Sequence, residues 1–239
     1  MCGRFTLTRT NLRDVATILE AELDAELEAA YSPRYNVAPS NIHWLLVNEG
    51  GRRQIVAGRW GFPIAFGPRK DDPVGLINAR SETAASKPTF RDSFARARCA
   101  VIADGFFEWS GPRGRRTPTW FHAPSRELLP LAGLWRERAC PETGEVERRF
   151  TILTTEANAV IEPCHARMPA ILPPASVGPW IEPAPQTRHP EALRRFTSEL
   201  SAHLRPADNS LLVATPVSSR VGNVRNDDPS CIEPERTLF

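Results

Sequence analysis

Proline is distributed along the whole chain, and this distribution limits the folds that the chain can adopt. The sequence contains 23 prolines in 239 residues, about twice the usual share of about 5%. A proline inside a helix removes a backbone hydrogen bond and clashes with the preceding turn, so long helical bundles and coiled coils are excluded. The chain must instead be built from short elements joined by many turns.

Hydrophobic periodicity predicts two main helices. Apolar side chains at steps of three and four residues predict a helix over residues 10–29, with Thr10 as its cap. A second helix is predicted over residues 190–204, because Pro190 suits the first turn of a helix. A short third helix is expected at residues 81–85.

Short extended runs bounded by glycine and proline predict that strands dominate the middle of the chain. The runs lie at residues 43–47, 54–60, 99–103, 106–110, 119–122, 131–135, 149–155 and 211–214. The arginine-rich residues 111–116 are expected to form the tip of a hairpin. These features predict an α+β fold in a single domain over residues 1–239, with a curved, mostly antiparallel sheet or β-barrel-like core and a few flanking helices.

Charge and cysteine content exclude several classes of protein. With 30 basic and 28 acidic residues the formal net charge is only +2, so any surface for nucleic acid must be local. The five cysteines are odd in number and contain no C-x-x-C pair, which indicates neither a disulfide framework nor a cysteine zinc site. No apolar run reaches the roughly 18 residues of a membrane helix, and no export signal is present. We therefore expect a cytoplasmic protein without a metal ion or cofactor.

The amino terminus carries the first candidate for chemistry. Met1 precedes Cys2, and removal of Met1 would leave an α-amine and a thiol on one residue. Such a 1,2-aminothiol captures an aldehyde through its amine as a Schiff base, and its sulfur then closes a thiazolidine ring. Gly3 would let a substrate approach closely. The alternative for Cys2 is a small apolar residue near a frayed terminus.

Three further segments contain residue types suited to proton transfer or phosphate binding. Glu108 lies among aromatic residues in a predicted strand, where an apolar setting would raise its pKa for acid–base chemistry. Its alternative is a carboxylate on the solvent face of the strand. His165 could transfer protons and Arg167 could hold a phosphate. Asn78 and Arg80 would share one face of an extended segment; alternatively, Asn78 caps a turn and Arg80 is solvated.

Seven motifs in a fixed order resemble those of one protein family. They are MCGRF at the start, RYNVAP at 34–39, WGF at 60–62, INARSET at 77–83, DGFFEW at 104–109, HARMPAIL at 165–172 and VGNVRND at 221–227. Together they resemble the SRAP family, or SOS response-associated peptidases. The resemblance runs from residue 2 to about residue 227 and leaves residues 228–239 as a C-terminal tail.

The resemblance implies a β-barrel-like α+β fold that recognises abasic sites in single-stranded DNA. In that family the N-terminal cysteine joins the ring-opened sugar as a thiazolidine, a covalent crosslink that shields the lesion during the DNA damage response. The resemblance therefore implies a crosslinking enzyme with lyase-like or peptidase-like chemistry, which includes autocatalytic removal of Met1. It also implies a monomer that associates with the nucleoid when it binds DNA.

Carried over by motif, the resemblance implies a catalytic role for four residues. Cys2 would be the nucleophile, and Asn78 would hydrogen-bond the sugar. Glu108 would act as acid and base on the amine and on the opening of the sugar, and His165 would assist Schiff-base formation and reversal.

Further residues are implied to contact DNA or to shape the pocket. They are Arg4, Arg80, Trp109 and Arg167 around the lesion, and Asn36, Pro39 and Thr154 in the pocket. One segment departs from the family pattern. Where bacterial relatives carry a tryptophan pair after the WGF motif, this chain has Phe66, which would be a smaller wedge against stacked bases.

Two other functions fit parts of the sequence. Class II glutamine amidotransferases also begin Met-Cys-Gly, so an N-terminal nucleophile amidohydrolase is one alternative. A noncatalytic single-stranded DNA binding module, in which Cys2 is incidental, is the other. Ammonia release from glutamine would indicate the first. DNA binding without a denaturation-resistant complex, unaffected by Cys2→Ala, would indicate the second.

Overall fold

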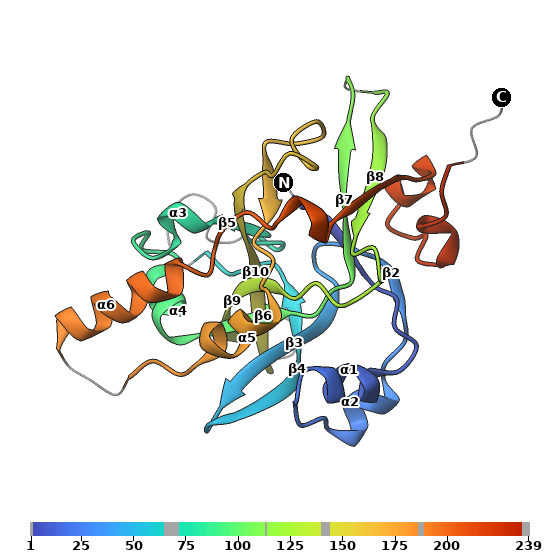
Figure 1. Ribbon diagram of the computed structural model, residues 1–239. Helices are drawn as coiled ribbons and strands as arrows, with labels where there is room; N and C mark the ends of the chain where they lie inside the picture. Colours follow the sequence, from blue (N-terminus) through green and yellow to red (C-terminus); the bar gives the residue numbers. More distant parts are fainter. Residues whose placement is uncertain (1, 65–71, 113, 140–143, 186–188, 236–239) are drawn as a thin grey trace.

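The computed structural model describes residues 2–64, 72–112, 114–139, 144–185 and 189–235 (Figure 1). Within these ranges the chain forms twelve strands in two sheets, with six α-helices around them. The predicted α+β class is confirmed. The helices are α1 (Leu12–Ile18), α2 (Ala25–Ala29), α3 (Ser81–Ala84), α4 (Arg91–Arg96), α5 (Pro174–Ile181) and α6 (Pro190–Ser201), and the 3-10 turns are η1 (Asn209–Leu211), η2 (Ser219–Gly222) and η3 (Pro229–Cys231).

The larger sheet closes on itself. Its ring consists, in pairing order, of β10 (Val146–Glu156), β4 (Arg52–Trp60), β3 (Ile42–Glu49), β6 (Arg98–Val101) and β9 (Leu131–Ala139). Strand β9 then pairs with β10, which completes the ring. The short strands β5 (Asn78–Arg80) and β11 (Arg167–Pro169) also pair with β10. Only the pairings of β10 with β4 and β5 are parallel among the named strand pairs, so the predicted mostly antiparallel, barrel-like core is confirmed.

The smaller sheet brings the amino terminus next to the predicted catalytic strand. Its order is β12 (Val213–Pro216), β8 (Thr117–His122), β7 (Gly105–Ser110), β1 (Arg4–Leu7) and β2 (Arg34–Val37), and every pairing is antiparallel. The register places Arg4 opposite Phe107. In Figure 1 the β7–β8 hairpin extends beyond the rest of the fold.

Aromatic packing joins the two sheets. Phe5 of β1 contacts Trp60 of β4, with ring centroids 5.0 Å apart, and Trp60 stacks on Phe150 of β10. All three side chains are fully buried. Because a buried Phe or Trp removes about 150–250 Å² of surface from water, this contact holds β1 firmly against the barrel and so fixes the start of the chain.

The predicted helix over residues 10–29 is wrong as a single element. The chain forms α1, leaves the helical path at Glu20 (φ +52°), and starts α2 after Asp24. Between the helices, Glu22 N–H donates to the carbonyl of Arg53, and Glu22 carbonyl accepts from Ile55 N–H. The backbone of Glu22 therefore makes hydrogen bonds to β4 in place of the hydrogen bonds that would continue the helix. Asn11, rather than Thr10, caps α1 by accepting a hydrogen bond from the backbone N–H of Arg13.

Most of the other predicted elements are confirmed, and the missed ones are short or irregular. The helix from residue 190 ends at Ser201, and the 111–116 segment joins β7 to β8 as the hairpin prediction requires. The missed strands β1, β2, β5 and β11 have three or four residues, too few for alternation to be visible. Helix α4 was missed, and α5 escaped prediction because Pro179 lies inside it.

Three observations concern membrane, metal and cysteine chemistry. No helix in the described ranges is both long and apolar enough to cross a membrane. Among the described residues, no group of three or more His, Cys, Asp or Glu side chains is placed to hold a metal ion. Four cysteines in the described ranges, Cys2, Cys99, Cys164 and Cys231, are free thiols.

Candidate functional site

A cavity of about 610 Å³ lies where the amino terminus meets the β7–β8 hairpin and the loop before β11. It is lined by Gly3, Arg4, Glu108, Trp109, Ser110, Gly111, Arg116, Pro163, Cys164, His165 and Gly222. Four of the predicted site residues are in this lining, although they come from three separate motifs. The cavity is therefore the candidate active site.

Cys2 directly precedes a residue of the cavity wall. Its side chain is fully buried, and the next residue, Gly3, lines the cavity. The side-chain amide of Asn78 donates a hydrogen bond of 2.8 Å to the backbone carbonyl of Cys2. Asn78 reaches this point because β5 pairs with β10, where Asn78 is opposite Ile152. The Asn78 Oδ1 atom is buried and accepts no hydrogen bond from any residue that the structure describes.

Burial shifts the pKa values of two groups of the site toward their neutral forms. Glu108 is only 3% exposed, and this burial raises the pKa of its carboxyl group. Burial also raises the pKa of the Cys2 thiol, and the negative charge of Glu108 raises it further. The thiol is therefore protonated at neutral pH when the site is empty. A protonated thiol is a weak nucleophile, so the Cys2 sulfur can add to a carbon only after another group has made that carbon more electrophilic.

The backbone of Arg167 holds the His165 ring. The Nδ1 atom of His165 lies 2.9 Å from the backbone N–H of Arg167 and 3.2 Å from its carbonyl, and the shorter contact favours the neutral tautomer with its proton on Nε2. Burial lowers the pKa of His165, and the positive charges of Arg167 and Arg116 lower it further. A neutral imidazole on the cavity wall can thus donate a proton from Nε2 or hydrogen-bond to an oxygen.

Arg4 is held by the C-terminal segment. Its guanidinium donates to Asn36 Oδ1 at 2.8 Å and to the carbonyls of Val221 and Gly222 at 2.8 and 3.2 Å. It also lies over the Trp109 ring, 5.9 Å from the centroid. These contacts fix the position of the guanidinium on the cavity wall.

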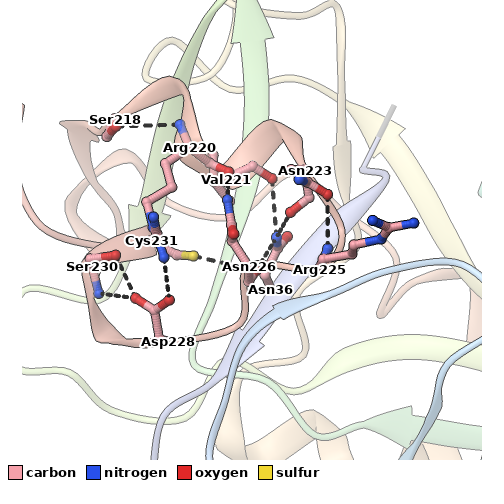
Figure 2. Close-up of polar contacts among 10 residues, drawn as sticks. All are labelled: Asn36, Ser218, Arg220, Val221, Asn223, Arg225, Asn226, Asp228, Ser230 and Cys231. Carbon is pink, nitrogen blue, oxygen red and sulfur yellow. Dashed lines mark hydrogen bonds and ion pairs between the residues drawn. The ribbon is translucent and has the colours of Figure 1, made fainter.

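Asn36 organises the loop that supports Arg4 (Figure 2). Its side-chain nitrogen donates to the carbonyls of Val221, Asn223 and Asn226 at 3.1, 3.1 and 2.7 Å. The carboxylate of Asp227 accepts from the backbone N–H of Asn36 at 2.8 Å. The RYNVAP and VGNVRND motifs are therefore joined by hydrogen bonds, and together they place one wall of the cavity.

Arg167 is engaged outside the cavity lining. Its guanidinium binds both carboxylate oxygens of Glu82, at 2.5 and 2.9 Å, and donates to the backbone carbonyl of Thr154. The Thr154 hydroxyl donates to the carbonyl of Ala79 at 3.4 Å. Arg80, at the N-cap of α3, is exposed to solvent.

A comparison with known families agrees with this arrangement. The sequence profile of the family described as SOS response associated peptidase (SRAP) matches residues 1–224. The chain belongs to the SRAP family. Its SRAP relatives include the abasic site processing protein YoqW of Bacillus subtilis, which is 35% identical over 98% of this chain and 99% of YoqW. The abasic site processing protein YedK of Escherichia coli is 30% identical over 98% of this chain and all of YedK.

The fold also matches solved structures. A crystal structure of a protein from Bacteroides thetaiotaomicron superimposes with a TM-score of 0.81, over 99% of this chain and all of that protein, at 21% sequence identity. At this identity the likeness concerns the fold. The SRAP fold of this chain is thus found in a distant sequence as well.

The structure separates the SRAP motif residues into two groups. Arg4, Glu108, Trp109 and His165 line the cavity. Cys2 directly precedes the lining residue Gly3 in the chain, and Asn78 hydrogen-bonds the carbonyl of Cys2. Asn36, Pro39, Arg80, Thr154 and Arg167 are not in the lining. Phe66 lies outside the described residues.

Sequence reasoning missed six lining residues, and Arg116, Cys164 and Gly222 are three of them. Arg116 could have been found from the hairpin pairing. Thr117 is opposite Ser110, so Arg116, the residue before Thr117, lies close to the Ser110 end of β7. Cys164 immediately precedes His165, and Gly222 belongs to the VGNVRND motif. Neither carried a signal of its own, since their positions depend on contacts between distant segments.

Proposed function

We propose that this SRAP protein processes abasic sites in single-stranded DNA by forming a covalent crosslink through Cys2. One observation carries the proposal: Asn78 holds the backbone of Cys2 beside a cavity that Glu108 and His165 line. The site thus combines a nucleophile with two proton-transfer groups. Relatives named abasic site processing proteins, which align over nearly the whole chain, support the same function.

The chemistry begins when removal of Met1 exposes the α-amine of Cys2. The amine attacks the aldehyde carbon of the ring-opened sugar, and the carbinolamine loses water to give a Schiff base. Because burial raises the pKa of Glu108, its carboxyl group can protonate the departing hydroxyl. The Cys2 sulfur then bonds to the same carbon, and the thiol proton moves to the nitrogen. One water is lost overall, and the product is a thiazolidine.

The protonated resting thiol favours this order of events. A thiol whose pKa is raised by burial and by Glu108 is a weak first nucleophile. An amine attacks first, and ring closure by sulfur is then intramolecular and strongly favoured by proximity. We assign His165 Nε2–H to the carbinolamine oxygen, and the buried Oδ1 of Asn78 to a sugar hydroxyl.

DNA would be held by arginines on both sides of the cavity. Arg4, Arg80 and Arg167 would contact backbone phosphates, while Trp109 and Phe66 would pack against bases or sugars. We assign Asn36 and Thr154 to positioning roles, because they hydrogen-bond Arg4 and Arg167 respectively. Pro39, between β2 and β3, would shape the approach to the site.

The proposal extends to processing and cellular context. Glu108 and His165 would also support autocatalytic cleavage of the Met1–Cys2 bond, which accounts for the peptidase in the family name. We further propose that the protein acts as a cytoplasmic monomer that joins the nucleoid when it binds DNA.

Intact mass spectrometry tests the proposed function. The purified protein is analysed before and after incubation with a single-stranded oligonucleotide that carries one abasic site. We expect loss of the Met1 mass, followed by an adduct equal to protein plus oligonucleotide minus one water. The Cys2→Ala variant is expected to form no such thiazolidine. If Met1 is absent and the wild-type protein forms no adduct, the crosslinking function is wrong; ammonia release from glutamine would then indicate an amidohydrolase.

A further inference from the structure

Two arginines line the cavity, and the protein uses them differently. Three protein oxygens accept hydrogen bonds from the Arg4 guanidinium, as described above. Arg116 is exposed, and its guanidinium has no hydrogen bond or ion pair with any residue that the structure describes. A guanidinium presents five N–H donors in a planar fork that matches phosphate geometry. Arg116 therefore offers the cavity an uncommitted anion-binding group.

The hairpin holds Arg116 at a defined place. Strands β7 and β8 remain paired up to Ser110 and Thr117, so Arg116 directly precedes the last paired residue rather than lying at the far end of the tip. The left-handed glycines Gly111 (φ +94°) and Gly114 (φ +90°) make the turn that returns the chain to this level. Figure 1 shows the hairpin extending past the body of the protein, beside the start of the chain.

The surroundings of Arg116 favour an anionic ligand. The chain contains no acidic residue between Glu108 and Glu127, so residues 109–126, which include the tip of the hairpin, carry only positive charge. The positive charge of Arg116 reaches across the cavity, since it is one of the groups that lower the pKa of His165. A phosphate beside Arg116 therefore meets no repulsive carboxylate from residues 109–126.

We propose that Arg116 binds a backbone phosphate of the DNA strand whose abasic sugar occupies the cavity, and so fixes the register of that strand. This inference rests on the proposed function, because it takes the occupant of the cavity to be an abasic nucleotide. Arg116 lies outside the seven motifs quoted above, so its proposed role rests on its place in the cavity lining.

Equilibrium binding across a range of salt concentrations tests the proposal. The ligand is a labelled single-stranded oligonucleotide with a tetrahydrofuran abasic analogue, which cannot open and so cannot crosslink. For Arg116→Gln we expect affinity to fall about tenfold, and the slope of log K against log salt to decrease by about 0.7, the value for one phosphate contact on a single strand. Arg116→Lys should retain the slope because it retains the charge.

Arg115→Gln is the matched control. Arg115 is an exposed arginine in the same hairpin, but it does not line the cavity. We expect this variant to change affinity by less than about twofold. An unchanged slope for Arg116→Gln, or an equal loss for Arg115→Gln, overturns the proposal.

Crosslinking of a natural abasic oligonucleotide by the wild-type protein separates this inference from the proposed function. If the wild-type protein crosslinks and Arg116→Gln keeps the wild-type slope, the phosphate contact is wrong and the function stands. If the wild-type protein does not crosslink but Arg116→Gln loses the slope, the contact stands and the crosslinking function is wrong.

Discussion

The side-chain amide of Asn78 donates a 2.8 Å hydrogen bond to the backbone carbonyl of Cys2, although the two residues are 76 positions apart. This bond links the barrel to the start of the chain, because Asn78 belongs to β5, which pairs with β10. It also orients Asn78 so that Oδ1 remains buried near Cys2 without a described partner. One amide therefore both positions Cys2, the proposed nucleophile, and presents an acceptor.

Asn78→Ala tests this double role. We expect single-turnover crosslinking to slow by about tenfold to a hundredfold, because a nucleophile displaced by about 1 Å loses that much rate. The side chain of Asn78→Asp keeps an acceptor oxygen but has no N–H to donate to the Cys2 carbonyl, so this variant should crosslink little faster than Asn78→Ala. The measurement is the rate of adduct formation at saturating abasic DNA. Wild-type rates in both variants would contradict a role for Asn78.

The pH dependence of crosslinking tests the assignment of Glu108. The attacking amine must be neutral, so the rate should rise with pH through the amine pKa. The acid must be protonated, and burial raises the pKa of Glu108, so the rate should fall as pH increases above that raised pKa. We expect a bell-shaped profile for the wild-type protein.

Glu108→Gln supplies the control for this profile. Glutamine keeps the shape of the side chain but cannot donate an acidic proton, so the rate should be lower and the descending limb at high pH should disappear. The expected loss is about a hundredfold, within the range for one acid–base group. If Glu108→Gln retains the descending limb, that limb belongs to another group.

The prediction from sequence was most successful where local pattern decides the structure. Alternation along residues 104–109 placed Phe107 and Trp109 on one face, and their rings pack with centroids 6.2 Å apart. The same alternation placed Glu108 in an apolar setting, and the structure confirms that Glu108 is buried. The short strands and their turns predicted a curved, barrel-like sheet, and the structure adds that the pairing of β9 with β10 closes it.

Long-range contacts explain what the sequence did not reveal. Periodicity over residues 10–29 continues through Glu20, but hydrogen bonds between Glu22 and β4 end the helix there. Asn36 was expected to shape the pocket, yet it acts through carbonyls as far as 190 residues away, at Asn226. No local pattern encodes such pairings. The single-domain organisation stays a prediction.

Substitutions of Arg167 test whether DNA binding depends on the planar shape of its guanidinium or only on its positive charge. Its guanidinium binds both oxygens of Glu82 and the carbonyl of Thr154 at once, which a lysine ammonium cannot reproduce. We expect Arg167→Lys to weaken binding of abasic DNA nearly as much as Arg167→Gln, by about fivefold to tenfold. The salt slope should decrease only in Arg167→Gln. Wild-type affinity in Arg167→Lys would show that charge alone suffices.

Asn36→Ala tests whether the C-terminal loop is held from β2. The substitution removes the donor to three backbone carbonyls and the acceptor of Arg4, and it leaves some of these groups buried without partners. Since a buried polar group without a partner costs about 1–3 kcal/mol, we expect the free energy of unfolding to fall by about 2–4 kcal/mol in urea denaturation. The affinity for abasic DNA should fall as well, because Arg4 loses a support.

Asn223→Ala is the control for the same loop. Asn223 is exposed, and its side chain accepts a hydrogen bond of 3.1 Å from the backbone N–H of Arg225 and from no other residue in the described ranges. We expect this variant to unfold at nearly the wild-type urea concentration and to bind DNA nearly as well. Equal destabilisation in the two variants would mean that the loop is stabilised by its own turns. A selective effect of Asn36→Ala would place the support of Arg4 in the bonds between β2 and the segment from Val221 to Asn226.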